Sequence, residues 1–308
     1  MSESVSAAVA IEGDTLRFVE VEQAEGAWHL RAVDEQVVGD DVADVLLAPE
    51  TEKQRLGPIV EGLQSLLEGT EAQALQFAVH PTDAYSFLTP ISADAPVQKR
   101  KQQLLRQASL VTGARSAEDL SLTSTTVRTA QDRNGDAYIW VHVLALPAAV
   151  EKRMTAINEV LPTDSHGWTV SVEAAARVTG HTERKGVSAQ QALQPYTLAV
   201  GQYATHTEYA LSRNREWYHG LHAAEGHNAA NRAYYAVGLL NRIDVSPESV
   251  GRLFVYGDDD SLSDPFQTLF ECEAEPLNPF SIVHGADSRS EPGLFVPCLG
   301  AALDDFVG

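Results

Sequence analysis

The chain has 308 residues, of which 44% are hydrophobic, so it can bury a sizeable core and is too apolar for a disordered protein. Its 43 acidic and 22 basic residues give a formal charge of -21, which argues against nucleic-acid binding and against direct docking on anionic lipid. The sequence shows no signal peptide, no CxxC motif and no run of roughly 18 apolar residues that could span a membrane, so we expect a cytoplasmic protein.

The first predicted elements are three short strands joined by tight turns. They cover Ala7–Ile11, Leu16–Val21 and Trp28–Val33, which are rich in alternating apolar residues. An amphipathic helix is expected over Glu52–Leu67, because leucine, isoleucine and valine recur on one helical face. A buried strand is then predicted at Leu75–Val79.

An insertion of about residues 85–146 interrupts this pattern. Its sequence predicts a strand at Tyr85–Leu88 and a helix at Val97–Thr112. A hairpin is expected around Asn134-Gly135, because this dipeptide is a strong turn signal. A helix over Ala148–Val160 and a strand-helix pair over Trp168–Val178 follow.

The second half of the chain repeats the order of the first. Three strands (Tyr196–Gly201, Thr205–Leu211 and Glu216–Tyr218) precede a helix from Glu225 to about Arg242 and a strand at Arg252–Tyr256. Two copies of meander, helix and strand predict an α/β fold of two related lobes around a cleft. We assign residues 1–190 to the first lobe, with its small α+β insertion, and residues 191–308 to the second.

This organisation resembles the actin-like ATPase superfamily, whose lobes are ribonuclease H-like. Within it, the segment Arg252–Val283 is similar to the PilM family of type IV pilus assembly proteins, including the ending Leu277-Asn278-Pro279-Phe280. Phe295–Phe306 resembles the closing helix of that family, and Val141–Val160 follows the family layout. The resemblance covers nearly the whole chain and implies the duplicated actin-like fold.

Three loops bind nucleotide in this superfamily, and the first is altered here. In the turn between the first two strands, Ala10 stands where the family has a metal-organising aspartate, and Glu12 stands in place of a glycine. Gly13 follows, and Arg17 replaces a lysine. Magnesium prefers carboxylate ligands, so Ala10 removes an anchor, while Glu12 adds negative charge where phosphates would lie.

The second and third loops are altered as well. In the second, Ala199 replaces an aspartate although Gly201 remains, and in the third, Gly257 is followed by the acidic Asp258. The sequence also lacks a counterpart of the adenosine-contacting segment of the family. Phosphoryl transfer depends on metal or positive charge near the phosphates. We therefore predict a pseudo-ATPase with no cofactor and no catalytic residues; the alternative is an actin-like ATPase or sugar-kinase relative with substituted ligands.

The resemblance also implies a partner. Members of the PilM family bind the short N-terminal tail of a membrane protein, PilN, in a groove between the first lobe and the inserted subdomain, at the cytoplasmic face of the inner membrane. Membrane contact would then be indirect, and a pilus motor ATPase or a ring of copies is a further possible partner. The residues expected to line the groove are Tyr85, Phe87, Lys99, Lys101, Leu104 and Leu105. The four apolar members of this set are equally consistent with a place in the core, and the basic cluster favours an ordinary solvated helix face over a contact for an acidic partner.

Other patterns of histidine, aspartate and serine favour ordinary structure over a metal or catalytic site. His219, His222 and His227 match no strong metal template and are expected in a solvated loop or helix start. The run Asp258–Asp260 favours an acidic turn over a cation site, and Asp132–Asp136 favours a hairpin turn over a calcium loop. The adjacent Asp164, Ser165 and His166 do not predict a catalytic triad.

Two further scaffold functions remain open from the sequence. One is the cytoplasmic part of a type II secretion scaffold, although such chains usually continue into a membrane helix. The other is a membrane-tethered division actin, for which the segment Leu303–Phe306 is too short and too acidic to form an amphipathic anchor.

Overall fold

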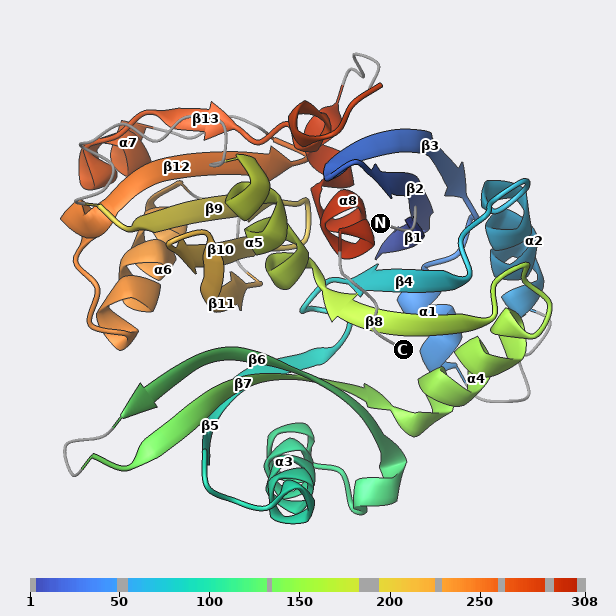
Figure 1. The fold of residues 1–308 in the computed structure, drawn as a ribbon, viewed down its shortest axis with the longest axis horizontal. Helices are drawn as coiled ribbons and strands as arrows, with labels where there is room; N and C mark the ends of the chain where they lie inside the picture. Colours follow the sequence, from blue (N-terminus) through green and yellow to red (C-terminus); the bar gives the residue numbers. More distant parts are fainter. Residues whose placement is uncertain are drawn as a thin grey trace.

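The computed structural model describes residues 4–48, 55–131, 135–182, 194–224, 229–259, 264–285 and 291–303. Figure 1 shows two large sheets side by side, with a smaller sheet and its helix beneath them. The two large sheets have five strands each and the small one has three. In the described part of the chain, no helix is both long and apolar enough to cross a membrane.

The first large sheet has the strand order β3-β2-β1-β4-β8. Its strands are β1 (Ser4–Glu12), β2 (Thr15–Ala24), β3 (Ala27–Val37), β4 (Ala74–Val79) and β8 (Ser165–Val170). β1 pairs antiparallel with β2 and parallel with β4. Because side chains alternate across a strand, Ala8 and Ala10 face the other lobe, whereas Val9 and Ile11 face the outer helices.

The second large sheet repeats this topology, in the order β11-β10-β9-β12-β13. Its strands are β9 (Tyr196–Gln202), β10 (Thr207–Arg213), β11 (Glu216–Ala223), β12 (Val250–Gly257) and β13 (Ala274–Pro276). β9 pairs antiparallel with β10 and parallel with β12, as β1 does with β2 and β4. The repetition predicted from the sequence is therefore present in the fold.

Two helices pack between the large sheets, and each covers the sheet of the opposite half. The helix α5 (Ser171–Thr182) follows β8 but packs on β10 and β11, whereas α8 (Val296–Ala302) packs on β1, β2 and β4. The two helices touch closely: a Cβ at Gly300 would lie 2.0 Å from the backbone oxygen of Ala174. This exchange forms a continuous apolar core between the lobes.

The outer faces of the large sheets are covered by shorter helices. α1 (Val42–Leu47), α2 (Leu56–Leu66) and α4 (Ala148–Asn158) pack on the first sheet, and α6 (Ala229–Arg242) and α7 (Asp264–Phe270) on the second. The expected helix starts at residues 52 and 225 lie outside the described residues.

The insertion forms the small sheet, in the order β5-β7-β6. It consists of β5 (Tyr85–Ser92), α3 (Val97–Thr112), β6 (Leu120–Gln131) and β7 (Ala137–Pro147). α3 covers one face of this sheet, and the other face is turned towards β11 of the second lobe (Figure 1). The predicted helix bounds agree with the structure, and Asn134 of the predicted turn lies outside the described residues.

Candidate functional site: the cleft between the lobes

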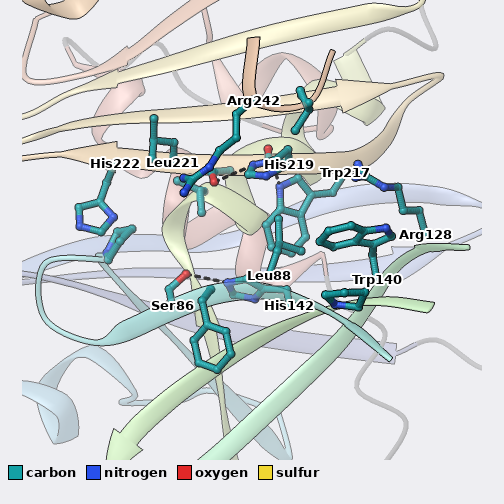
Figure 2. Close-up of a pocket in the computed structure, with 16 residues that line it drawn as sticks. Ser86, Leu88, Arg128, Trp140, His142, Trp217, His219, Leu221, His222 and Arg242 are labelled. Atoms are coloured by element: carbon teal, nitrogen blue, oxygen red, sulfur yellow. Dashed lines mark hydrogen bonds between the residues drawn. The ribbon is translucent and has the colours of Figure 1, made fainter. Parts of the chain in front are cut away.

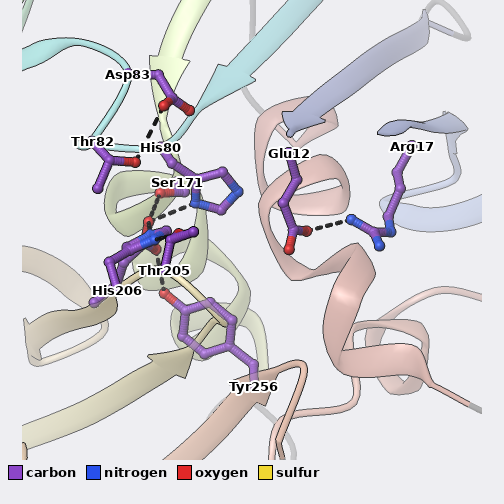
Figure 3. Close-up of polar contacts among 10 residues, drawn as sticks. Glu12, Arg17, His80, Thr82, Asp83, Ser171, Thr205, His206 and Tyr256 are labelled. Carbon is purple, nitrogen blue, oxygen red and sulfur yellow. Dashed lines mark hydrogen bonds and ion pairs between the residues drawn. The ribbon is translucent and has the colours of Figure 1, made fainter. Parts of the chain in front are cut away.

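The first loop, at the turn between β1 and β2, carries charges that neutralise each other. Glu12 and Arg17 lie close together at the end of this hairpin and form an ion pair, shown in Figure 3. The Arg17 guanidinium also lies 3.6 Å from the carboxylate of Glu35, and Ala10 is buried between the lobes. The charges of Arg17 and Glu12 are thus paired within the protein, and Glu12 is not an isolated negative charge.

The same turn is tied to the segment that follows β3. The backbone oxygen of Gly13 accepts a hydrogen bond from the N–H of Val42 at 2.8 Å, and that of Asp14 accepts one from Val38 at 2.9 Å. Gly13 has φ = 56°, a left-handed conformation that favours glycine. The glycine in this loop therefore serves the turn and its contact with the start of α1.

The second and third loops bond to each other. The backbone N–H of Asp258 donates to the oxygen of Gln202 at 2.7 Å, and the carboxylate of Asp258 accepts from the N–H of Ala204 at 2.8 Å. The side-chain amide of Gln202 donates to the backbone oxygen of Asp259 at 2.8 Å. Backbone groups that hold phosphates in an anion-binding loop are here paired within the protein.

The two glycines retained in these loops have packing roles. A Cβ at Gly201 would lie 2.6 Å from the ring of Tyr256, and a Cβ at Gly257 would lie 2.4 Å from the backbone oxygen of Gln202. Ala199 is fully buried in the interlobe core. Contacts within the protein therefore account for both glycines, because each lets a neighbouring ring or backbone approach closely.

A buried glutamate, Glu208 on β10, occupies the cleft next to these loops. One carboxylate oxygen lies 2.7 Å from Nδ1 of His80, 3.0 Å from Nε2 of His206 and 2.5 Å from the hydroxyl of Ser171. The other oxygen accepts a hydrogen bond from Tyr256 at 3.1 Å. His80 follows β4 and Ser171 begins α5, so this cluster joins the two lobes (Figure 3).

Charge is balanced inside the cluster. Burial alone would raise the pKa of Glu208, but the neighbouring His80 and the hydrogen bonds from both histidines outweigh burial and lower it. Burial would lower the pKa of His80, but the Glu208 carboxylate outweighs it and raises the pKa. Burial raises the pKa of Tyr203, whose ring stacks on His206 with 4.8 Å between centroids. This cluster cannot be predicted from the sequence, because its members are far apart in the chain.

The predicted partner-binding residues fall on different surfaces of the insertion. Lys101, Leu104 and Leu105 line a groove of about 580 Å³ between α3 and the strands of the small sheet. Phe87 packs in the core of the insertion, while Tyr85 is 46% exposed at the start of the edge strand β5. Lys99 lies on the exposed surface of α3. The groove brings together three of the six residues, and it lies within the insertion, not between the insertion and the first lobe as expected. Phe87 packs against the same apolar cluster as Leu104.

A second pocket of about 610 Å³ lies between the insertion and β11 (Figure 2). Of the described residues that line it, none is acidic. Arg128 lies over the ring of Trp140 and donates to the backbone oxygen of Tyr218 at 2.8 Å. Burial lowers the pKa of His142 to about 3 and that of His219 to about 4. This pocket cannot be predicted from the sequence, because its walls come from separate lobes.

His219 and His222 lie half-buried in β11. The expectation of a solvated loop or helix start is therefore wrong for these two residues. β11 continues to Ala223, beyond the predicted end of the strand, and carries both histidines towards the insertion. His166 contacts Glu151 at 3.1 Å, and the described contacts of the triad-like run include none between His166 and Ser165. Asp260, His227 and the start of the Asp132–Asp136 run lie outside the described residues.

Comparison with known proteins gives a structural match only. No protein-family model matches the sequence, and no curated protein matches it. The structure is similar to a solved structure of a PilM-PilN type IV pilus biogenesis complex, with a TM-score of 0.63, 16% identity and coverage of 98% of both chains.

Two further solved structures are similar to this chain, with lower TM-scores. One is a Bacteroides thetaiotaomicron protein with an actin-like ATPase fold (TM-score 0.48, 9% identity, 90% and 91% coverage). The other is the cytoplasmic domain of EpsL from the Vibrio cholerae type II secretion system (TM-score 0.47, 12% identity, 89% and 90% coverage). The similarity to the pilus complex shows that this chain has the actin-like fold of duplicated lobes that the sequence predicts.

Proposed function

We propose that the chain is a non-catalytic, actin-like scaffold of a type IV pilus or a related secretion machine. It binds the N-terminal tail of a PilN-like membrane protein and is held in this way at the cytoplasmic face of the inner membrane. The fold shared with the PilM-PilN complex structure supports this proposal at the level of architecture. The observation that carries the pseudo-ATPase assignment is the pairing of the second loop with the third.

The charge and packing of the cleft support the loss of nucleotide. Arg17 is engaged with Glu12, and the buried carboxylate of Glu208 takes up the donors of the neighbouring histidines and hydroxyls. A triphosphate would have to break these contacts to reach the hydrogen-bond donors of the cleft. The described cleft residues thus supply little to attract a phosphate.

The groove between α3 and the small sheet is the surface that we assign to the partner tail. Its floor is apolar, formed by Ile91, Leu122 and Ile139 together with Leu104 and Leu105. β6 is an edge strand of this sheet, so an extended peptide could add to it. Lys101 places a cation at the groove of an otherwise acidic protein, which favours a tail with an acidic residue next to its apolar anchors.

Capture of the membrane partner from the source cells tests this assignment. Wild-type chain is used as bait beside Leu105→Asp and Lys101→Glu, which place a negative charge in the groove. Leu110→Asp and Lys99→Glu are the matched controls, because Leu110 is 72% exposed and Lys99 is exposed on the same helix. We expect the wild type and both controls to retain an inner-membrane protein that the groove variants lose. Equal capture by all five proteins would contradict the groove, and recovery of soluble metabolic enzymes alone would contradict the scaffold.

A further inference from the structure

The buried side chains at the centre of the cleft are arranged as metal ligands. Nδ1 of His80, Nε2 of His206 and a carboxylate oxygen of Glu208 each offer one ligand atom, and these atoms lie within 4.8 Å of one another. The exposed fraction of each of the three residues is 2% or less. Two imidazoles and one carboxylate form a donor set that suits zinc and related first-row transition metals.

Hydrogen bonding alone accounts poorly for the contacts of Glu208. His80, His206 and Ser171 all approach the same oxygen, at 2.7, 3.0 and 2.5 Å, whereas the other oxygen accepts only from Tyr256 at 3.1 Å. A carboxylate oxygen has two lone pairs, so three donors crowd it. A cation at the point of convergence would replace this crowding with direct bonds to the ligand atoms.

The surroundings of the three ligands also fit a metal. The second ring nitrogen of His206 lies 2.9 Å from the hydroxyl of Thr205, so it can donate there and leave Nε2 free to bind a metal. Tyr203 closes one side, with its ring centroid 4.5 Å from that of His80. Its buried hydroxyl lacks a hydrogen-bond partner among the described residues, which leaves an unused polar atom in the wall of the cluster.

We propose that His80, His206 and Glu208 bind a divalent transition metal, zinc by preference, at a site between the lobes. Ligand atoms around a tetrahedral zinc lie about 3.3 Å apart, close to the separations of 2.7 and 3.0 Å between the Glu208 oxygen and the two histidine nitrogens. A water molecule supplies the fourth position. His80 belongs to the first lobe and the other two ligands to the second, so the metal ties the lobes together where the superfamily holds nucleotide.

Metal analysis of the full chain tests the site. The protein is produced without a polyhistidine tag in zinc-supplemented medium and dialysed, and its metal content is measured by mass spectrometry. We compare the wild type with Glu208→Gln and His206→Gln. His166→Gln is the control, because it removes a histidine–glutamate contact outside the cleft. We expect about one zinc per chain in the wild type and control, and at least about 100-fold weaker zinc binding in the two cleft variants.

A second measurement on the wild type keeps the test decisive if the cleft variants fail to fold. Cobalt(II) added to chelator-treated wild-type protein should give the visible absorption of a tetrahedral nitrogen–oxygen site, and zinc should abolish it. Wild-type protein that retains no zinc and gives no such spectrum would overturn the proposal, as would folded Glu208→Gln that binds zinc like the wild type. Either failure concerns the metal alone and leaves partner capture as the separate test of the scaffold.

Discussion

The carboxylate of Asp258 accepts a hydrogen bond from the backbone N–H of Ala204 at 2.8 Å, which fastens the turn after β12 to the turn after β9. The backbone N–H of Asp258 points the same way and bonds to Gln202. In a phosphate-binding loop such N–H groups would face the ligand. The residue that looked from the sequence like a repulsive charge therefore acts as a link between two loops.

This link predicts that substitution of Asp258 has a small and specific effect on stability. Asp258→Ala removes the acceptor for Ala204 and should lower the free energy of unfolding by about 1 kcal/mol. Asp258→Asn keeps an oxygen that can accept the same bond and should change stability much less. Urea denaturation of the two variants checks this, and an Asp258→Asn variant as unstable as Asp258→Ala would argue that charge, not the hydrogen bond, matters.

The close crossing of α5 and α8 predicts that a side chain added at Gly300 strongly lowers stability. A Cβ there would lie 2.0 Å from the backbone oxygen of Ala174, and backbone cannot move aside as a flexible side chain can. We expect Gly300→Ala to lower the free energy of unfolding by about 3 kcal/mol. Gly238→Ala is the control, because a Cβ at that position of α6 meets nothing within 4 Å, and it should stabilise by about 0.5–1 kcal/mol. Similar stability of the two variants in denaturant melts would contradict the close helix crossing.

His142 predicts a loss of stability in mild acid. Burial, aided by the nearby His219, lowers its pKa to about 3 in the folded protein. Glu173, 3.7 Å away, is engaged with Arg177 and does not hold a proton on the imidazole. Between the ordinary pKa of histidine, near 6.5, and this value, the unfolded chain binds one more proton than the folded chain, so stability falls as the pH falls.

The comparison of wild type with His142→Gln isolates this contribution. From pH 7 to pH 5, the wild type should lose about 2 kcal/mol more stability than the variant, in which glutamine can still bond to Ser86. Chemical denaturation at the two pH values supplies the measurement. Parallel losses in the two proteins would show that His142 is not held neutral by burial.

The two cysteines should differ sharply in reactivity. Burial raises the pKa of Cys298 to about 12, and its thiol lies 3.1 Å from the backbone oxygen of Ala8 in the interlobe core. Cys272 is only partly buried. Because the thiolate is the reactive species, a disulfide reagent should modify at most Cys272 in native protein and both thiols after denaturation. Native Cys272→Ser should therefore remain unlabelled, and rapid labelling of that variant would contradict the packing around α8.

The elements that the sequence predicted well are those fixed by local signals. The helix Val97–Thr112 agrees with its predicted range because it ends at Gly113, whose left-handed conformation suits glycine. Apolar runs also predict strands at the positions of nine of the ten strands in the large sheets, whereas β13, with three residues, is too short to give such a run. The short helix α1 was missed, because six residues give too little periodicity, although its N-cap Asp41 is a usable signal.

The candidate site was harder to predict because it depends on contacts distant in sequence. His80 and Glu208 are 128 residues apart, and nothing local marks either one as a buried partner of the other. The exchange of α5 and α8 between the sheets is likewise a tertiary feature. The pairing of Glu12 with Arg17 was within reach, since both flank one hairpin turn, but both residues were interpreted only against the pattern of the superfamily.

Titration of the intact chain with ATP and magnesium in a calorimeter tests the central claim most directly. The bonds between the second and third loops and the ion pair of Glu12 with Arg17 in the first loop predict no binding heat up to about millimolar nucleotide, a limit that corresponds to about -4 kcal/mol. Saturable binding in the micromolar range would show that the cleft still accepts a triphosphate and would contradict the account.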